Sequence, residues 1–120
     1  MPTAALMLTM VVALLHVYFL VLEMFLWTKP TGRRVFRTTE EFANASAALA
    51  ANQGLYNGFL AAGLVWSIVL GAAGNDVRIF FLTCVIIAGI YGAATVSRRI
   101  LYIQALPALV AALLTYFSHS

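Results

Sequence analysis

Nine polar residues stand out in a largely apolar sequence because their chemistry suits the binding of a small charged ligand. Amide and phenol groups orient a ligand through hydrogen bonds, and guanidinium groups hold a carboxylate or phosphate by paired contacts. A carboxylate at membrane depth often marks a proton or ion site. We predict that one polar pocket is lined by Glu23, Asn52, Gln53, Tyr56, Asn57, Tyr91, Arg98, Arg99 and Tyr102.

Glu23 is the acidic residue of this set, and it lies inside a long apolar stretch. An isolated charge at the centre of a bilayer costs about 2.5–3.5 kcal/mol even on the lenient insertion scale. We therefore predict that Glu23 pairs with Arg98 or Arg99. Two interpretations of that pair remain open: a salt bridge between helices that stabilises packing, or a carboxylate that meets a ligand or a proton.

A histidine and a cysteine could also be reactive, but their surroundings in the sequence favour structural roles. His16 has no second histidine or carboxylate three or four residues along the helix, so we interpret it as a hydrogen-bonded packing residue and expect no metal site. Cys84 lies within an apolar run and is interpreted as a small packing residue. The basic residues are too few for a nucleic-acid surface, and no catalytic motif or cofactor-binding motif is evident.

The elements that position these residues follow from composition. Of 120 residues, 63% are apolar and 9% are charged, whereas soluble domains average about 25% charged residues. Segments of about 20 apolar residues cross a bilayer as helices. The sequence predicts a single integral membrane domain over residues 1–120, an all-α bundle of four transmembrane helices at about residues 4–27, 50–71, 77–96 and 101–117.

The second helix is predicted to extend beyond the membrane into the cytoplasm. Thr38 and Glu41 have the spacing of a capping box, and no helix-breaking residue follows before Gly71. The segment from Lys29 to Arg37 is expected to be a loop, and Pro107 is expected to kink the fourth helix.

The distribution of basic residues predicts the orientation of the four spans. The first and third loops together hold Lys29, Arg33, Arg34, Arg37, Arg98 and Arg99, whereas the opposite side holds only Arg78. Cytoplasmic loops carry the excess of Lys and Arg. We expect a multi-pass protein of the inner (plasma) membrane, with both termini on the non-cytoplasmic side and the polar pocket near the cytoplasmic face.

Two stretches, LHVYFLVLEMFLWTKPTGRRVF (residues 15–36) and LAANQGLYNGFLAAGLVWS (residues 49–67), closely resemble the domain of unknown function 1304 family. Members of that family are small bacterial membrane proteins with four predicted spans. The resemblance covers nearly the whole chain. It implies a membrane location and carries no established activity.

A more distant resemblance links the chain to the membrane-associated eicosanoid and glutathione metabolism superfamily. NQGLYNGFLA (residues 52–61) is similar to its second-helix motif, with Tyr56 where that superfamily has an acid and Gln53 near its Asn. Arg98, Arg99 and Tyr102, followed by Gln104, Leu106 and Pro107, are similar to its basic and tyrosine-bearing region. This resemblance implies a trimer that binds glutathione between subunits, with a thiolate stabilised by Arg or Tyr.

Three interpretations of function follow. The first is a binding protein or enzyme whose cytoplasmic pocket takes a small anionic ligand, with glutathione as a candidate and no other cofactor evident. The second is a small transporter or channel subunit, which the apolar far leaflet disfavours. The third is a structural accessory protein whose polar residues only fix packing. Because four helices enclose little space, we expect a homo-oligomer in the bilayer.

Overall fold

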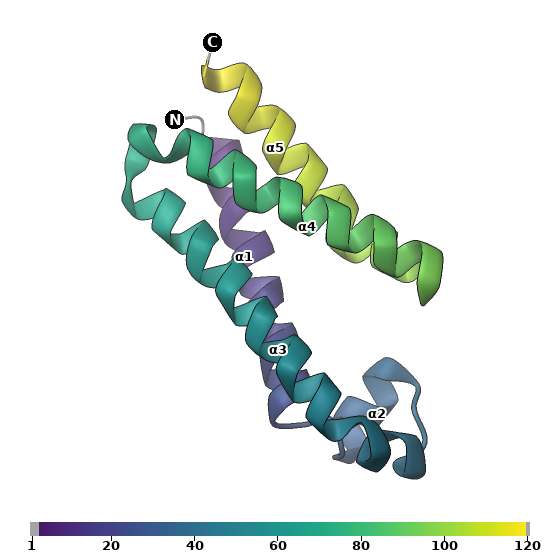
Figure 1. Ribbon diagram of the computed structural model, residues 1–120. Helices are drawn as coiled ribbons and strands as arrows, with labels where there is room; N and C mark the ends of the chain where they lie inside the picture. Colours follow the sequence, from purple (N-terminus) through teal and green to yellow (C-terminus); the bar gives the residue numbers. More distant parts are fainter. Residues whose placement is uncertain (1–2, 120) are drawn as a thin grey trace. The chain divides into compact units, whose positions relative to one another are not determined.

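The computed structural model describes residues 3–119, and every regular element in that range is helical, as predicted. The helices form two compact units: a first unit of residues 3–13 and 60–119, and a second unit of residues 14–59. The elements in chain order are α1 (Thr3–Met24), α2 (Pro30–Phe36), α3 (Glu40–Val69), the 3₁₀-helix η1 (Gly71–Gly74), α4 (Asn75–Thr95), the π-helix η2 (Leu101–Ala105) and α5 (Leu106–His119) (Figure 1).

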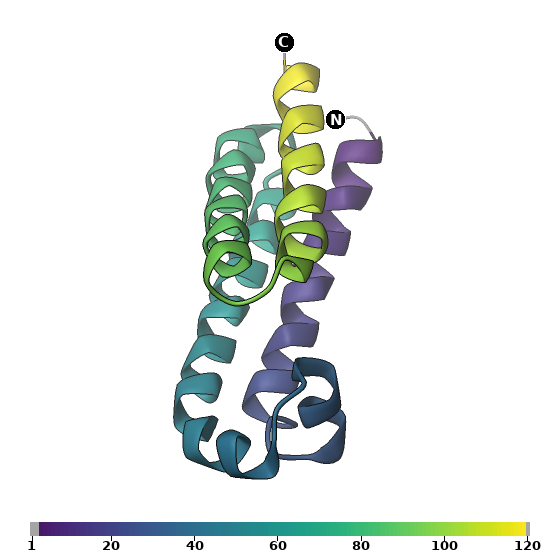
Figure 2. The same ribbon diagram turned by 90° about the vertical axis from the view of Figure 1, so that its right-hand side faces the viewer.

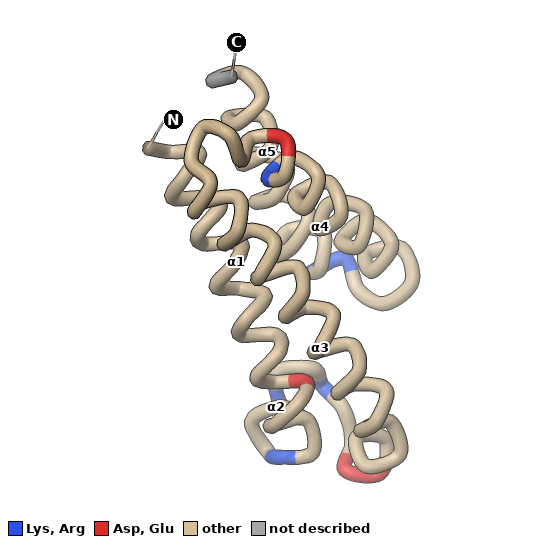
Figure 3. The backbone as a smooth tube through the Cα atoms, turned by 60° about the vertical axis from the view of Figure 1, so that its left-hand side comes forward, with Lys and Arg blue, Asp and Glu red and all other residues tan. Residues whose placement is uncertain are grey.

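Two helical stretches within the described range are long and apolar enough to cross a membrane, judged by length and composition. They are Thr3–Met24 and Gly71–Thr95, and Leu101–Phe117 is a shorter apolar helix. The four-span arrangement therefore stays a prediction. The seven basic and four acidic residues all lie in the end turns of the long helices or in the segments between them, as the coloured tube in Figure 3 shows.

The segment between α1 and α3 differs from the predicted loop. α1 ends at Met24 rather than near Trp27, and residues Pro30–Phe36 form the short helix α2 with Pro30 at its first position. Proline suits that position because the first turn leaves its N–H groups without intrahelical partners. A Cβ on Gly32 would lie 2.0 Å from the carbonyl oxygen of Leu26, so only glycine fits this turn.

The start of α3 also corrects a prediction. The predicted capping box began at Thr38, but the helix begins at Glu40 and Thr39 is its cap: the Phe42 N–H donates to Thr39 Oγ1 over 3.1 Å. The Thr38 hydroxyl is buried and has no hydrogen-bond partner among residues 3–119. α3 still runs for 30 residues, about 45 Å at 1.5 Å per residue, so the expectation of a long helix beginning well before residue 50 is confirmed.

In the second unit, α1 and α3 approach closely where α3 carries glycine. A Cβ on Gly54 would lie 2.7 Å from Met24 Cγ and 3.1 Å from Glu23 Cβ, and one on Gly58 would lie 2.8 Å from Leu20 Cδ1. Small residues allow such backbone approach between apolar helices. The indole of Trp27 donates to Ser46 Oγ over 3.1 Å and thereby ties the end of α1 to the first turns of α3.

The first unit has a continuous apolar core from four helices. Val12 of α1, Leu64 of α3, Leu82 and Val85 of α4, and Ala108 and Ala111 of α5 are all buried in it. α3 reverses into α4 through Gly71, whose φ of +66° is a left-handed conformation that glycine adopts without strain.

Within the same unit, α4 and α5 run side by side, and residues 96–100 join α4 to η2, which leads directly into α5 (Figure 2). Proline at position 107 has no N–H to donate to the carbonyl oxygen of Ile103. The chain forms the π-helix η2 just before it, where a simple kink was predicted. The Leu106 N–H accordingly donates to the carbonyl oxygen of Leu101, five residues back.

Candidate functional site

The carboxylate of Glu23 has a defined partner in the second unit. Asn57 of α3 donates from Nδ2 to Glu23 Oε1 over 2.5 Å. Asn57 is buried and Glu23 is half-buried, at the level where Gly54 lets the two helices approach. Of the nine residues predicted to line one pocket, Glu23 and Asn57 therefore lie together in the structure.

The other polar residues of α3 lie elsewhere on the helix. Asn52, Gln53 and Tyr56 are exposed, whereas Asn57 belongs to the buried side. At 3.6 residues per turn, Asn52 and Asn57 are about 140° apart around the axis. The Tyr56 ring contacts only the edge of Phe59 among the ring contacts described here, at a centroid distance of 5.7 Å. Of the predicted stripe, only Asn57 contacts Glu23 in the hydrogen bonds of the described residues.

Four candidate residues belong to the first unit and gather around the end of α4. Tyr91, Arg98, Arg99 and Tyr102 are all exposed. The Arg99 N–H donates to Ser97 Oγ over 3.2 Å, which fixes the backbone of the short connection that carries both arginines. Because Glu23 belongs to the second unit, its predicted pairing with Arg98 or Arg99 stays a prediction.

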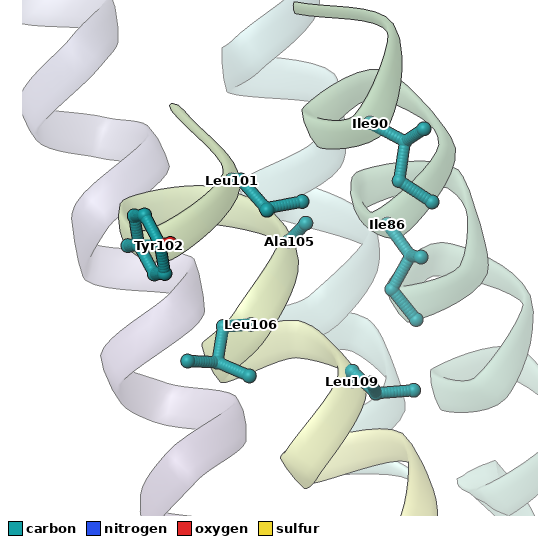
Figure 4. Close-up of a pocket in the computed structure, with 7 residues that line it drawn as sticks. All are labelled: Ile86, Ile90, Leu101, Tyr102, Ala105, Leu106 and Leu109. Atoms are coloured by element: carbon teal, nitrogen blue, oxygen red, sulfur yellow. The ribbon is translucent and has the colours of Figure 1, made fainter. Parts of the chain in front are cut away.

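An apolar groove, which we call the α4–α5 groove, opens beside this connection with a volume of about 190 Å³. Ala105 is buried against Gly89 at its base, where a Cβ on Gly89 would lie 2.7 Å from Ala105 Cβ. In Figure 4, Leu101 and Leu109 extend toward the side on which Ile86 and Ile90 lie. The groove is lined by Ile86, Ile90, Leu101, Tyr102, Ala105, Leu106 and Leu109.

Sequence reasoning included Tyr102 in a candidate site and missed the rest of this groove. The available signal was the spacing of Leu101, Ala105 and Leu109 at intervals of four, with a small residue between two large ones. That spacing also describes ordinary packing. The structure adds that Leu101 of η2 and Leu109 of α5 both remain exposed beside α4.

Two residues with little predicted role are fully buried. His16 is 0% exposed and packs edge to face with Phe19 at a centroid distance of 5.6 Å. Arg78 is also 0% exposed; it donates from Nε to Ser67 Oγ over 3.4 Å and from Nη2 to the Ser67 carbonyl over 3.5 Å. Sequence reasoning treated Arg78 only as a marker of orientation, so its contact with the end of α3 is new.

Comparison with known families matches residues 10–116 to the family described as protein of unknown function DUF1304. The chain belongs to the DUF1304 family. The match includes all nine predicted pocket residues as well as the whole α4–α5 groove. The resemblance of residues 15–36 and 49–67 to this family is therefore confirmed.

A relative of this DUF1304 chain is described as the uncharacterized protein YpaA of Lactococcus lactis subsp. lactis (strain IL1403). The two are 30% identical over 119 residues, which cover 98% of this chain and 100% of the relative. No solved structure matches the chain. The more distant resemblance to the eicosanoid and glutathione superfamily stays a prediction, and the activity must be argued from the site itself.

Proposed function

We propose that this DUF1304 protein is a four-span protein of the plasma membrane that binds a small anionic ligand beside its cytoplasmic face. The observation that carries the proposal is the pair Arg98 and Arg99 in the short connection after α4, flanked by the exposed phenols of Tyr91 and Tyr102. Guanidinium groups bind carboxylate and phosphate by two parallel hydrogen bonds, and phenols add a donor that can orient the bound group.

The proposed orientation rests on charge. Lys29, Arg34 and Arg37 lie in the segment between α1 and α3, and Arg98 and Arg99 lie between α4 and η2. With four spans these two segments share a side, and a basic excess favours the cytoplasmic side. The two helices long and apolar enough to cross a membrane support a membrane location. Both termini then lie on the non-cytoplasmic side.

The ligand class follows from the chemistry of the cations. Glutathione is the first candidate to test because it carries two carboxylates and because the distant superfamily resemblance implies it. A homo-oligomer, with a trimer as the favoured form, extends the same proposal. The test of oligomeric state is light scattering of the purified protein together with chemical cross-linking in native membranes.

The binding experiment uses the thermal stability of the full-length protein in detergent. Glutathione, glycerol phosphate, nucleotides and simple carboxylates are added in turn, and a rise in Tm reports binding to the folded state. Arg98→Ala should abolish the shift. Arg34→Ala is the matched control, since it removes an exposed arginine from the second unit. If no anion, whether added in solution or present as a lipid headgroup, binds in an Arg98-dependent way, the proposal is wrong.

The orientation is tested separately with single cysteines. Cys84→Ser removes the natural thiol, after which Thr31→Cys and Ala72→Cys report opposite sides of the membrane. A membrane-impermeant maleimide applied to intact cells should label position 72 and spare position 31. The reverse pattern contradicts the proposed topology and leaves the anion test unaffected.

A structural role is the second candidate, and one observation favours it. Glu23 is hydrogen-bonded to Asn57 at the closest approach of α1 and α3, which is the arrangement expected of a packing contact between helices. On this account the Glu23–Asn57 pair stabilises the second unit and takes no part in ligand binding. If Glu23→Gln leaves the ligand-induced rise in Tm unchanged, the pair has a structural role and takes no part in binding.

A further inference from the structure

We infer that the α4–α5 groove binds one acyl chain of an anionic phospholipid, and that Arg98 and Arg99 bind the phosphate of the same lipid. The inference rests on the proposed function, because it names the ligand class of the same pair of arginines. The two arginines and all residues that line the groove belong to the first unit.

The shape and lining of the groove suit a hydrocarbon chain. Six of its seven lining residues have aliphatic side chains, and the seventh is Tyr102. Its volume of about 190 Å³ is smaller than the roughly 300–1,000 Å³ of typical small-molecule pockets. Apart from the Tyr102 phenol, the side chains of the lining offer no hydrogen-bonding group. In a bilayer such a lining contacts methylene groups by van der Waals packing, so a preference for one lipid over another must come from its headgroup.

The base and walls of the groove have a simple origin in the sequence. Gly89 and Ala105 let α4 and η2 approach closely at the base. Ile90 of α4 and Leu101 of η2 form part of the two walls and remain 54% and 38% exposed. Apolar side chains left exposed around a small-residue base form a concave surface that a mobile chain can cover.

The arginines lie at one end of this groove. Leu101, which lines the groove, is hydrogen-bonded from its N–H to the carbonyl oxygen of Arg98 over 3.0 Å. The connection of residues 96–100, which carries both arginines, directly precedes Leu101 in the chain, and Figure 2 shows it at one end of the α4–α5 pair. A ligand with an anionic head and an apolar tail therefore meets complementary chemistry at both of its parts. Phosphatidylglycerol has both parts, whereas a soluble anion has only the first.

The π-helix adds a second observation at the same place. η2 contributes Leu101, Tyr102 and Ala105 to the lining, and π-helical turns are rare and often occur at functional sites. Pro107 accounts for the turn sterically. Tyr102 of this turn follows Arg99 by three residues and is 64% exposed. The phenol is then available to the headgroup.

The test uses the full-length protein in phosphatidylcholine nanodiscs that contain a trace of photoactivatable phosphatidylglycerol, with a diazirine in the acyl chain. After irradiation, peptide mass spectrometry maps the adducts. We expect them on residues 86–109, with fewer when photoactivatable phosphatidylcholine is used. Arg98→Gln and Arg99→Gln should each reduce labelling about five-fold, the effect of one basic residue near an anionic surface.

A matched pair of variants tests the groove itself. Leu109→Trp fills it, whereas Leu113→Trp makes the same change four residues along α5, at a leucine of similar exposure outside the lining. Labelling should fall in the first and persist in the second. Equal labelling in both overturns the inference, and so does uniform labelling of every lipid-facing helix. If Leu109→Trp instead changes the oligomeric state and leaves labelling intact, the groove is an interface between copies.

Failure of this inference differs from failure of the proposed function. If glutathione or glycerol phosphate raises Tm through Arg98 while the groove stays unlabelled, the arginines bind a soluble anion and the acyl-chain site is wrong. If neither the soluble anions nor the phospholipid depend on Arg98, the proposed function itself is wrong.

Discussion

Asn57 Nδ2 lies 2.5 Å from Glu23 Oε1 and donates a hydrogen bond to it between α3 and α1. This contact joins the one acidic side chain near the end of α1 to the one buried amide of the Asn52–Asn57 stretch. Its surroundings are close-packed, since a Cβ on Gly54 would already contact Glu23 Cβ at 3.1 Å. The pair is therefore held by backbone approach as well as by its own hydrogen bond.

The first prediction concerns loss of the amide. Asn57→Leu leaves the Glu23 carboxylate without its donor in a half-buried position, and an unsatisfied buried polar group costs about 1–3 kcal/mol. We expect the free energy of unfolding in detergent to fall by about that amount. Asn52→Leu makes the same change at an exposed position of the same helix and should have a much smaller effect. Equal losses in the two variants would show that the hydrogen bond contributes nothing.

The sequence alone predicted the long helices but not which side of α3 faces α1. Apolar runs predicted the long helices, because a bilayer-length run of Leu, Val, Ile and Ala permits little else. The side of α3 that faces α1 was not predictable, since it depends on where Gly54 and Gly58 allow close approach. Asn52 and Asn57 therefore fell into one predicted face although the structure separates them.

Local turn chemistry explains the remaining differences. The segment from Lys29 to Arg37 was predicted to be a loop, but Pro30 begins the short helix α2 within it. Proline breaks an interior helical turn and yet fits a first turn, so its presence alone does not separate a loop from a helix start. Pro107 was expected to kink a continuous helix, and the chain forms η2 before it. The π-helix places Ala105 directly against Gly89, and that contact between helices is not visible in any local pattern.

The second prediction tests that packing. Gly89→Ala would bring a methyl group within 2.8 Å of the Ala105 backbone nitrogen and 3.0 Å of its Cα, so α4 and η2 must separate. Overpacking of this kind costs about 1–3 kcal/mol. In Gly92→Ala the nearest atoms belong to the flexible side chain of Ile100, and the change should be tolerated. Thermal denaturation of both variants checks the difference; equal Tm values would argue against close contact at Gly89.

The third prediction separates two adjacent threonines. Thr39 Oγ1 accepts the Phe42 N–H at the start of α3, and loss of such a cap costs about 0.5–2 kcal/mol. The Thr38 hydroxyl is buried, and no other described residue forms a hydrogen bond with it. Thr39→Ala should lower Tm, whereas Thr38→Ala should leave it unchanged or raise it. The opposite ranking would restore Thr38 as the cap, as the capping-box spacing with Glu41 originally predicted.

The fourth prediction concerns Arg78, whose guanidinium donates to Ser67 in the last turn of α3. Carbonyl groups in a last turn lack intrahelical partners, and a cation there also interacts favourably with the helix dipole. Arg78 is fully buried, so Arg78→Ala removes these contacts and leaves a cavity. We expect the free energy of unfolding to fall by about 2–5 kcal/mol, the range for large-to-small changes in a core.

Two controls distinguish this role from a general effect of removing positive charge. Arg98→Ala removes an exposed arginine and should change stability by no more than about 0.5 kcal/mol. Ser67→Ala removes the hydroxyl that Arg78 contacts but keeps the Ser67 carbonyl, so its cost should lie between the other two. Because Arg78 belongs to the core of the first unit and the α4–α5 groove does not include it, a destabilised but folded Arg78→Ala protein should still be labelled by the photoactivatable lipid. If Arg78→Ala keeps full stability and loses labelling, the residue serves the ligand rather than the end of α3.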